Sequence, residues 1–287
     1  MLATFVNVLF DGLLMGGIYA LIAIGFSLQY GVARVLNISH GEFIMLGAFM
    51  TWWFFTRFFL NPLASLLITA PTIFIIGFFL YKTLFTSLRK TSGAGFEASS
   101  LLLSFGLVFI IQNLAIILWG RDIRGYTFMA SPVRILGAIF AFNRVLALVL
   151  SVCLGILFYM FLARSRTGKA IRAAAQDPSV AELMGVNMRN VLSLCFGLGI
   201  LMASIAGCLV SMMYEITPVM GLEYTIISMI VVVLGGLGSI PGCFLSGFIL
   251  GLVGSIVNYT QPGLSLAVYY FLFVAILLIR PSGLFGR

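Results

Sequence analysis

Residues 12–42 read GLLMGGIYALIAIGFSLQYGVARVLNISHGE, an uncharged apolar run followed by a short polar stretch. The apolar part, residues 12–33, is long enough to cross a lipid bilayer as a helix, which takes about 20 largely apolar residues. Residues 31–42 then bring in glycine, arginine, asparagine, histidine and glutamate before the next apolar run begins. This stretch predicts a membrane-spanning helix followed by a break in regular structure.

Similar apolar runs continue to the end of the chain. Two clusters of Gly and Pro, at 235–242 and 258–263, divide the longest run, residues 224–279, into three helices. We therefore expect an all-α polytopic membrane protein, a single transmembrane domain over residues 1–287, with about eight or nine transmembrane helices, some of them interrupted. The other charge-free runs are residues 43–56, 58–81, 98–120, 145–163 and 190–214.

The composition indicates the same class. The chain has 287 residues, of which 62% are hydrophobic and 8% charged, against roughly 45–50% and 25% in soluble domains. So few charges cannot cover a soluble protein, which excludes most soluble enzymes and nucleic-acid binders. The net charge of +8 fits the enrichment of Lys and Arg in cytoplasmic loops. A nine-span alternation places the N-terminus outside and three basic groups in the cytoplasm: Lys82, Arg89 and Lys90; residues 164–189; and Arg280 with Arg287.

Two breaks, 31–42 and 235–242, have the character of paired helix interruptions, which point to the substrate path of a transporter. The sequence 39–42 also fits a capping box, in which Ser39 and Glu42 bond to backbone N–H groups at a helix start. The box either simply starts a helix or aims the positive end of the helix dipole at an anionic substrate group. The predicted path residues are Asn37, Ser39, His40, Gly41, Glu42, Gln112, Asn113, Gly235, Gly236 and Gly238.

Few side chains in the apolar runs carry chemistry. His40 is the only histidine, which excludes a histidine metal site and leaves a hydrogen-bonded side chain or a proton relay. The adjacent amides Gln112 and Asn113 need either interhelical partners or a polar lumen. The sequence holds no Gly-Lys-Ser/Thr loop and no set of residues that would activate a nucleophile, so we expect neither an enzyme nor a bound metal or cofactor. An ion-coupled secondary transporter is the alternative, although the charge-free runs disfavour it.

Small residues recur on two predicted helices, as Gly12-x-x-x-Gly16 and Gly247-x-x-x-Gly251. This spacing allows close contact between helix backbones, and we expect it to serve packing within the chain, with a dimer seam as the alternative. The four cysteines lie in apolar runs and are expected to be small buried residues rather than disulfides.

The segment 164–189 is the most polar part of the chain. Residues 169–176 are strong helix formers, Asp177 is a suitable N-cap with Pro178 at the first helical position, and Gly185 is a suitable stop. Two short helices with a sharp corner are therefore expected. The small apolar face either lies on the membrane or docks to a soluble partner, and the number of capping signals favours docking.

Five motifs, taken together, carry a family resemblance. They are NISHGE at 37–42 with LGA at 46–48, RTGKAIRA at 166–173, DP at 177–178 with AELMGVN at 181–187, LGGLGSIPG at 234–242 and RPSGLF at 280–285. Each motif is weak alone, but their order and spacing cover nearly the whole chain. The chain resembles the membrane subunits of ATP-binding cassette (ABC) importers for branched-chain amino acids, the LivH type.

This resemblance implies an ABC importer permease fold in a bacterial inner membrane, and a path for branched-chain amino acids. The implied partners are a second, similar permease, a periplasmic binding protein, membrane lipid and two cytoplasmic ATPase subunits, which would hold ATP and Mg²⁺. The family also includes permeases for urea, short amides and other amino acids. The segment 164–189 would be the ATPase-coupling loop, with Lys169, Arg172, Ala173, Asp177, Pro178, Ala181, Glu182, Leu183 and Gly185 as coupling residues.

Overall fold

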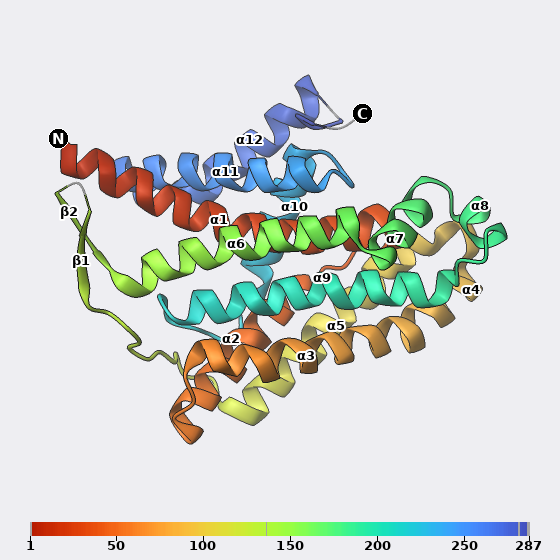
Figure 1. The fold of residues 1–287 in the computed structure, drawn as a ribbon, viewed down its shortest axis with the longest axis horizontal. Helices are drawn as coiled ribbons and strands as arrows, with labels where there is room; N and C mark the ends of the chain where they lie inside the picture. The colour runs from red at the N-terminus through yellow and green to blue at the C-terminus, as the bar shows by residue number, and fades with distance from the viewer. Residues whose placement is uncertain (1, 136, 281, 286–287) are drawn as a thin grey trace.

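The computed structural model describes residues 2–135, 137–280 and 282–285. Pro281 of the C-terminal motif and Arg287 of the third basic group lie outside these residues. The chain is an elongated bundle of helices (Figure 1). The N-terminus and the hairpin of β1 (Pro132–Ile135) and β2 (Ala138–Ala141) lie at one end, here called the hairpin end. The short helix α7 lies at the opposite end, here called the α7 end.

The predicted all-α membrane architecture is confirmed. Within the part of the chain that the structure describes, six helical segments are long and apolar enough to cross a membrane. They are α1 (Leu2–Ala33), α3 (Pro62–Leu80) with its continuation to Ser92, α5 (Phe96–Trp119), α6 (Phe142–Arg164), α9 (Met188–Ser211) and α11 (Ile240–Thr260). Adding the shorter helices α2 (His40–Phe58), α10 (Gly221–Gly235) and α12 (Ser265–Ile279) gives nine apolar helices in the described residues, in line with the expected eight or nine.

The remaining elements connect these helices. A π-helical turn (Tyr81–Phe85), α4 (Thr86–Ser92) and a 3-10 turn (Gly93–Gly95) join α3 to α5. The helices α7 (Arg166–Gln176) and α8 (Pro178–Leu183) join α6 to α9. The two Gly- and Pro-containing clusters fall between α10 and α11 and between α11 and α12, where the sequence predicted breaks.

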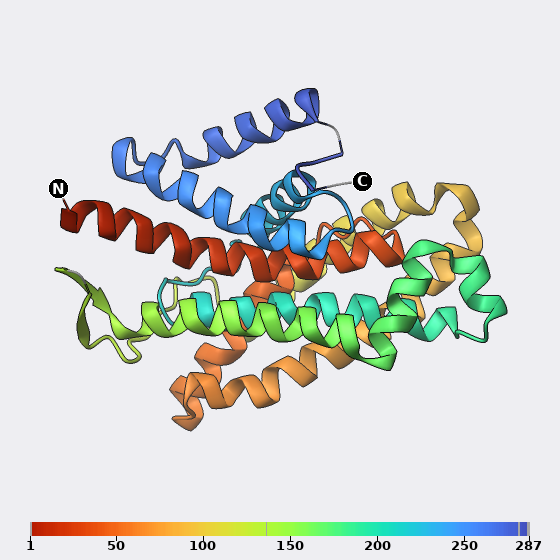
Figure 2. The ribbon, with the colours of Figure 1, turned by 45° about the horizontal axis from the view of Figure 1, so that its top comes forward.

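The helices α1 and α9 form the centre of the bundle, and the other long helices surround them (Figure 2). Nearly all of α9 is buried, whereas α5 exposes Leu102 and Ile117, and α12 exposes Leu278. Exposed apolar faces on the outer helices are what a lipid bilayer covers. The structure is therefore that of a multi-pass membrane protein.

The glycine pairs of α1 and α11 lie against each other. A Cβ added to Gly16 would lie 2.7 Å from the Cα of Phe248, and one added to Gly247 would lie 2.6 Å from the backbone N of Ala20. Packing within the chain, the expected role of these residues, is confirmed. The cysteines follow the expectation at Cys195, Cys208 and Cys243; the expectation is wrong for Cys153, which is exposed because α6 lies on the outside of the bundle.

The described residues of the three basic groups share one end of the bundle. Arg189 donates a hydrogen bond to the carbonyl oxygen of Lys82 at 3.3 Å, and Arg89 donates to the carbonyl oxygen of Ala33 at the end of α1. The N–H of Leu284, just after Arg280, donates to the carbonyl oxygen of Leu234 near the end of α10. This one-sided distribution matches the alternation that the charges predicted.

Candidate functional site

The first break in the sequence becomes a segment that returns into the bundle. After α1 ends at Ala33, residues 34–39 turn back, and α2 begins inside the bundle rather than at its end (Figure 1). The imidazole Nε2 of His40 lies 3.1 Å from the carbonyl oxygen of Ile22, well inside α1. Arg34 makes the turn with a φ of 52°. The predicted interruption is therefore a re-entrant segment.

Side chains of α5 satisfy the backbone of this segment. The N–H of Leu36 donates to Ser100 Oγ at 3.1 Å, and the N–H of Ile38 donates to Ser104 Oγ at 3.0 Å. The single proton of Ser104 Oγ is shared between the carbonyl oxygens of Leu36 at 3.0 Å and Leu101 at 2.9 Å. Irregular backbone inside a membrane protein requires such partners, because hydrocarbon supplies none.

A second interrupted helix, α10, begins beside the start of α2. Thr225 Oγ1 accepts a hydrogen bond from the N–H of Gly41 at 2.8 Å and donates one to the carbonyl oxygen of Ile38 at 2.9 Å. Gly41 packs so tightly on Gly221 that a Cβ on Gly41 would overlap the Gly221 carbonyl oxygen. Residues 36–42, together with Gly221 and Thr225, are called the central junction below.

The polar side chains of the central junction are buried and bonded to one another. Asn37 Nδ2 donates to Gln29 Oε1 at 3.1 Å, and Gln29 Nε2 donates to the carbonyl oxygen of Phe196 at 3.3 Å. Ser39 Oγ donates to Asn37 Oδ1 at 2.6 Å. Asn37, Ser39 and His40 are all fully buried. Neighbouring helices therefore hold this part of the predicted path in one arrangement.

The predicted capping box is wrong. The Ser39 side chain makes no cap hydrogen bond to α2, because it donates to Asn37 instead. Glu42 accepts a hydrogen bond from Gln112 Nε2 of α5 at 3.0 Å, and its other carboxylate oxygen has no hydrogen-bond partner in the described residues. The Glu42 carboxyl group lies against Gly221 at the start of α10, where an added Cβ would be 2.6 Å from the carboxyl carbon.

The two adjacent amides of α5 have different surroundings. Gln112 forms the interhelical hydrogen bond to Glu42 described above. Asn113 points away, is exposed and donates to the carbonyl oxygen of Phe109 in its own helix at 2.8 Å. Of the two possibilities open from the sequence, the interhelical partner is therefore the one seen for Gln112.

The second predicted break lies outside the central junction. Gly235 packs on the backbone of Gly242, and Ser239 Oγ caps α11 by accepting from the N–H of Gly242 at 3.2 Å. A Cβ on Gly31 would lie 2.8 Å from the Cα of Gly238, so the two predicted breaks meet only at the end of α1. Gly235, Gly236 and Gly238 thus form a tight turn toward the α7 end.

The sequence did not identify the true partner of the first break. That partner is the connection 212–220, which returns from the hairpin end, where Ile216 bonds to the backbone of Arg124, into the bundle at the start of α10. Ser100, Ser104 and Thr225 were missed as well. The signal for the first two was a pair of hydroxyls four residues apart in a largely apolar run, which places both on one helix face.

The two expected helices of the polar loop are confirmed. Asp177 Oδ1 caps α8 by accepting from the N–H groups of Ser179 at 2.9 Å and Val180 at 3.1 Å, with Pro178 as the first helical residue. Hydrogen bonds from the Ser179 hydroxyl and the Val180 N–H hold the pKa of the Asp177 carboxyl below its ordinary value. Gly185, with φ of 84°, ends the helix as a left-handed cap.

The helix α8 projects beyond the neighbouring helices at the α7 end (Figure 2). Leu183 is 86% exposed and Met184 81% exposed, although both are apolar. Ala181, another predicted coupling residue, is buried within the chain itself. The other predicted coupling residues are exposed, apart from the half-buried Ala173: Lys169, Arg172, Asp177, Pro178, Glu182 and Gly185.

Interrupted helices that meet at a buried polar junction are typical of membrane transport proteins. The family model described as "branched-chain amino acid transport system / permease component" matches residues 8–277. The chain belongs to this family, and the predicted transport permease is confirmed.

Named relatives cover nearly the whole chain. The chain is 30% identical to the high-affinity branched-chain amino acid transport system permease protein BraD of Pseudomonas aeruginosa, over 97% of this chain and 95% of BraD. It is 29% identical to LivH of Salmonella typhimurium, over 99% and 96%, and 25% identical to the probable LivH of Methanocaldococcus jannaschii, over 97% and 92%. Its fold is similar to that of PsaBC from Streptococcus pneumoniae, solved in complex with Fab, with a TM-score of 0.51, 12% identity, and 98% and 97% of the two chains covered.

Proposed function

We propose that this chain is the membrane subunit of an ABC importer and forms part of the path for branched-chain amino acids. The observation that carries the proposal is the similarity to BraD, a branched-chain amino acid permease, along 97% of the chain. Permeases for urea, short amides or other amino acids are the alternatives within the family.

In this proposal the path passes the central junction. Glu42 and Gln112 join α2 to α5 through one hydrogen bond, and Ser100 and Ser104 add further bonds along the same face of α5. Separation of α5 from the re-entrant segment would release these polar groups to substrate or water. Rigid-body movement of one helix group against another is the usual way in which transporters alternate access. The predicted path residues of the second break would border the path at the α7 end.

The energy would come from partner subunits. The exposed apolar residues of α8 suit a groove on a cytoplasmic ATPase, and ATP and Mg²⁺ would bind to two such subunits rather than to this chain. A second, similar permease would complete the path within lipid, and a periplasmic binding protein would deliver substrate at the hairpin end. The α7 end would then face the cytoplasm of a bacterium, with the protein in the inner membrane.

The test measures coupling in the full complex, reconstituted in proteoliposomes with its binding protein. Leu183→Asp places a charge in the proposed ATPase contact and should lower substrate-stimulated ATP hydrolysis and leucine uptake at least 10-fold, since the side chain is exposed and its loss should leave the fold intact. Thr91→Asp is the matched control, because Thr91 is exposed in α4 at the same end of the bundle and lies outside α8. Uptake and hydrolysis that Leu183→Asp leaves unchanged would contradict the proposed coupling. Uptake driven by an ion gradient without ATP would favour a secondary transporter, and uptake of urea but not leucine would favour the amide alternative.

A further inference from the structure

A polar cavity lies at the hairpin end, apart from the central junction. Its volume is about 560 Å³, within the range of small-molecule sites. Side chains of α1, α6, α10, α11 and α12 line it, together with the segment after α9. The residues that matter for its chemistry are Asp11, Tyr19, Arg144, Tyr214, Glu223 and Tyr269.

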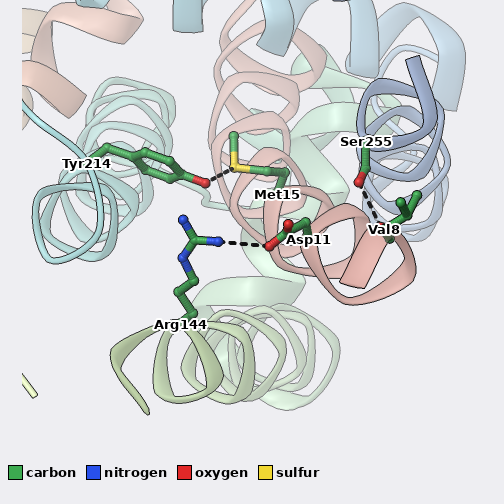
Figure 3. A network of polar contacts seen from close by, with 6 residues as sticks. All are labelled: Val8, Asp11, Met15, Arg144, Tyr214 and Ser255. Atoms are coloured by element: carbon green, nitrogen blue, oxygen red, sulfur yellow. Dashed lines mark hydrogen bonds and ion pairs between the residues drawn. The ribbon is translucent and has the colours of Figure 1, made fainter. Parts of the chain in front are cut away.

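An ion pair between two membrane helices forms one wall of this cavity (Figure 3). Arg144 Nη1 of α6 lies 3.0 Å from Asp11 Oδ1 of α1, and the two side chains are 35% and 42% exposed. A pair that water reaches to this extent is worth little in free energy, so an incoming ligand can exchange with either partner. The guanidinium has further donors available, because a single nitrogen makes the bond to Asp11.

Aromatic rings surround the pair. The guanidinium carbon of Arg144 lies 5.8 Å from the centroid of the Tyr214 ring, and the Tyr214 hydroxyl lies 3.5 Å from the sulfur of Met15. Tyr19 and Tyr269 meet edge to face, with centroids 6.2 Å apart. Tyrosine presents an apolar ring with a polar tip, so these walls can contact both an aliphatic chain and polar groups.

Glu223 gives the cavity an excess of negative charge. It lies in the first turn of α10, is exposed, and forms no ion pair in the described residues. Asp11 and Arg144 balance each other, which leaves the Glu223 carboxylate without a counter-charge. The cavity therefore offers one guanidinium for an anion and two carboxylates for a cation, across a space lined by tyrosine rings.

We propose that this cavity binds a free α-amino acid. The carboxylate would bind Arg144, the ammonium group would bind Glu223 and Asp11, and an aliphatic side chain would pack on the tyrosine rings. This inference rests on the proposed function for the choice of substrate class, and it adds a site at the hairpin end that is separate from the path at Glu42. The ammonium and phosphate of a phosphatidylethanolamine headgroup share the same pattern of charges, so the test has to separate the two sources.

The experiment measures equilibrium binding of radiolabelled leucine to the full complex, without binding protein or ATP, in nanodiscs of phosphatidylcholine alone. Leucine should bind saturably. Leucinol, which lacks the carboxylate, and 4-methylpentanoate, which lacks the ammonium group, should each compete at least 10-fold more weakly. Glu223→Gln should weaken leucine binding at least 10-fold, because it removes the uncompensated charge. Glu215→Gln is the matched control, since Glu215 is exposed at the same end and does not line the cavity.

Several results would overturn the proposal. One is the absence of saturable binding to a complex that still takes up leucine with ATP and binding protein, which would leave the proposed function standing. Another is binding that Glu42→Gln abolishes and Glu223→Gln leaves unchanged, which would place the site at the central junction. A third is copurified phosphatidylethanolamine that leucine does not displace and that Glu223→Gln releases. This result would assign the cavity to lipid. Saturable binding of a different amino acid together with loss of leucine uptake would support the cavity and contradict the proposed substrate.

Discussion

The two interruptions at 34–39 and 236–239 look alike in the sequence, and the structure holds them in opposite ways. The partners of the first are remote: its hydrogen bonds reach Ser100, Ser104 and Thr225, which are 64 to 187 residues away along the chain. The partners of the second are local. The Ser239 N–H donates to the Gly236 carbonyl oxygen, and Ser239 accepts from a residue three positions further on.

The first break is therefore a junction held by contacts between helices, whereas the second is a simple turn held by local contacts. The first break depends on α5 and α10 lying beside it, because the backbone groups of Leu36 and Ile38 bond to side chains of those two helices. The second forms from its own residues and glycine geometry, with φ of 94° at Gly236 and 83° at Gly238. Substitutions at the first break should therefore disturb several helices, whereas those at the second should act locally.

The largest effect is expected from Gly41→Ala at the first break. The added methyl group would overlap the carbonyl oxygen of Gly221 and come within 2.5 Å of Thr225 Oγ1, so two helix starts would have to separate. Overpacking of a rigid core typically costs 1–3 kcal/mol, and we expect the loss in free energy of unfolding to reach at least about 3 kcal/mol. Unfolding in mixed SDS micelles, followed by tryptophan fluorescence, measures it.

Two further alanine substitutions sharpen this comparison. Gly31→Ala should cost less than Gly41→Ala, because the added atom meets one close backbone atom, the Cα of Gly238 at 2.8 Å, whereas at Gly41 it overlaps a carbonyl oxygen and also meets Thr225. Gly106→Ala on α5 should be neutral or slightly stabilising, since an added Cβ there meets nothing within 4 Å. Equal losses in the free energy of unfolding for Gly41→Ala and Gly31→Ala would contradict the distinction between a junction of helices and a local turn.

An intermediate effect is expected from Ser104→Ala. The substitution leaves the N–H of Ile38 without its acceptor and removes the donor to the Leu36 carbonyl oxygen. Hydrogen bonds within membranes contribute about 0.6 kcal/mol on average and up to about 1.7, and a buried orphan group adds to the cost. A loss of about 1–2 kcal/mol in the same unfolding assay is expected. Ser99→Ala, one position before Ser100 on the same helix, serves as the control. A similar loss in free energy of unfolding for Ser99→Ala would mean that the effect does not depend on the hydrogen bonds of Ser104.

The same contrast explains what the sequence could predict. The caps of α7 and α8 and the turn at 236–239 depend on residues within a few positions of each other, so local signals such as Asp177-Pro178 and Gly185 were sufficient. The capping box failed because Ser39 donates to Asn37, two positions back, and Glu42 bonds to Gln112 at a separation of 70 residues, which local sequence does not show. The connection 212–220 was missed because hydrophobicity does not distinguish a surface loop from a re-entrant one.

Among the substitutions that remove an interaction, the smallest effect is expected from Ser239→Ala at the second break. Its hydroxyl accepts from the N–H of Gly242, and removal of such a cap costs about 1 kcal/mol, while Ser239→Gly should cost only a few tenths. Ser39→Ala, at the same position relative to α2, should cost more than Ser239→Ala, because it leaves the fully buried Asn37 Oδ1 without its donor. If Ser39→Gly instead lowered the free energy of unfolding no more than Ser239→Gly does, the Ser39 hydroxyl would contribute no more than the cap at Ser239. The first break would then be held by α5 and α10 alone.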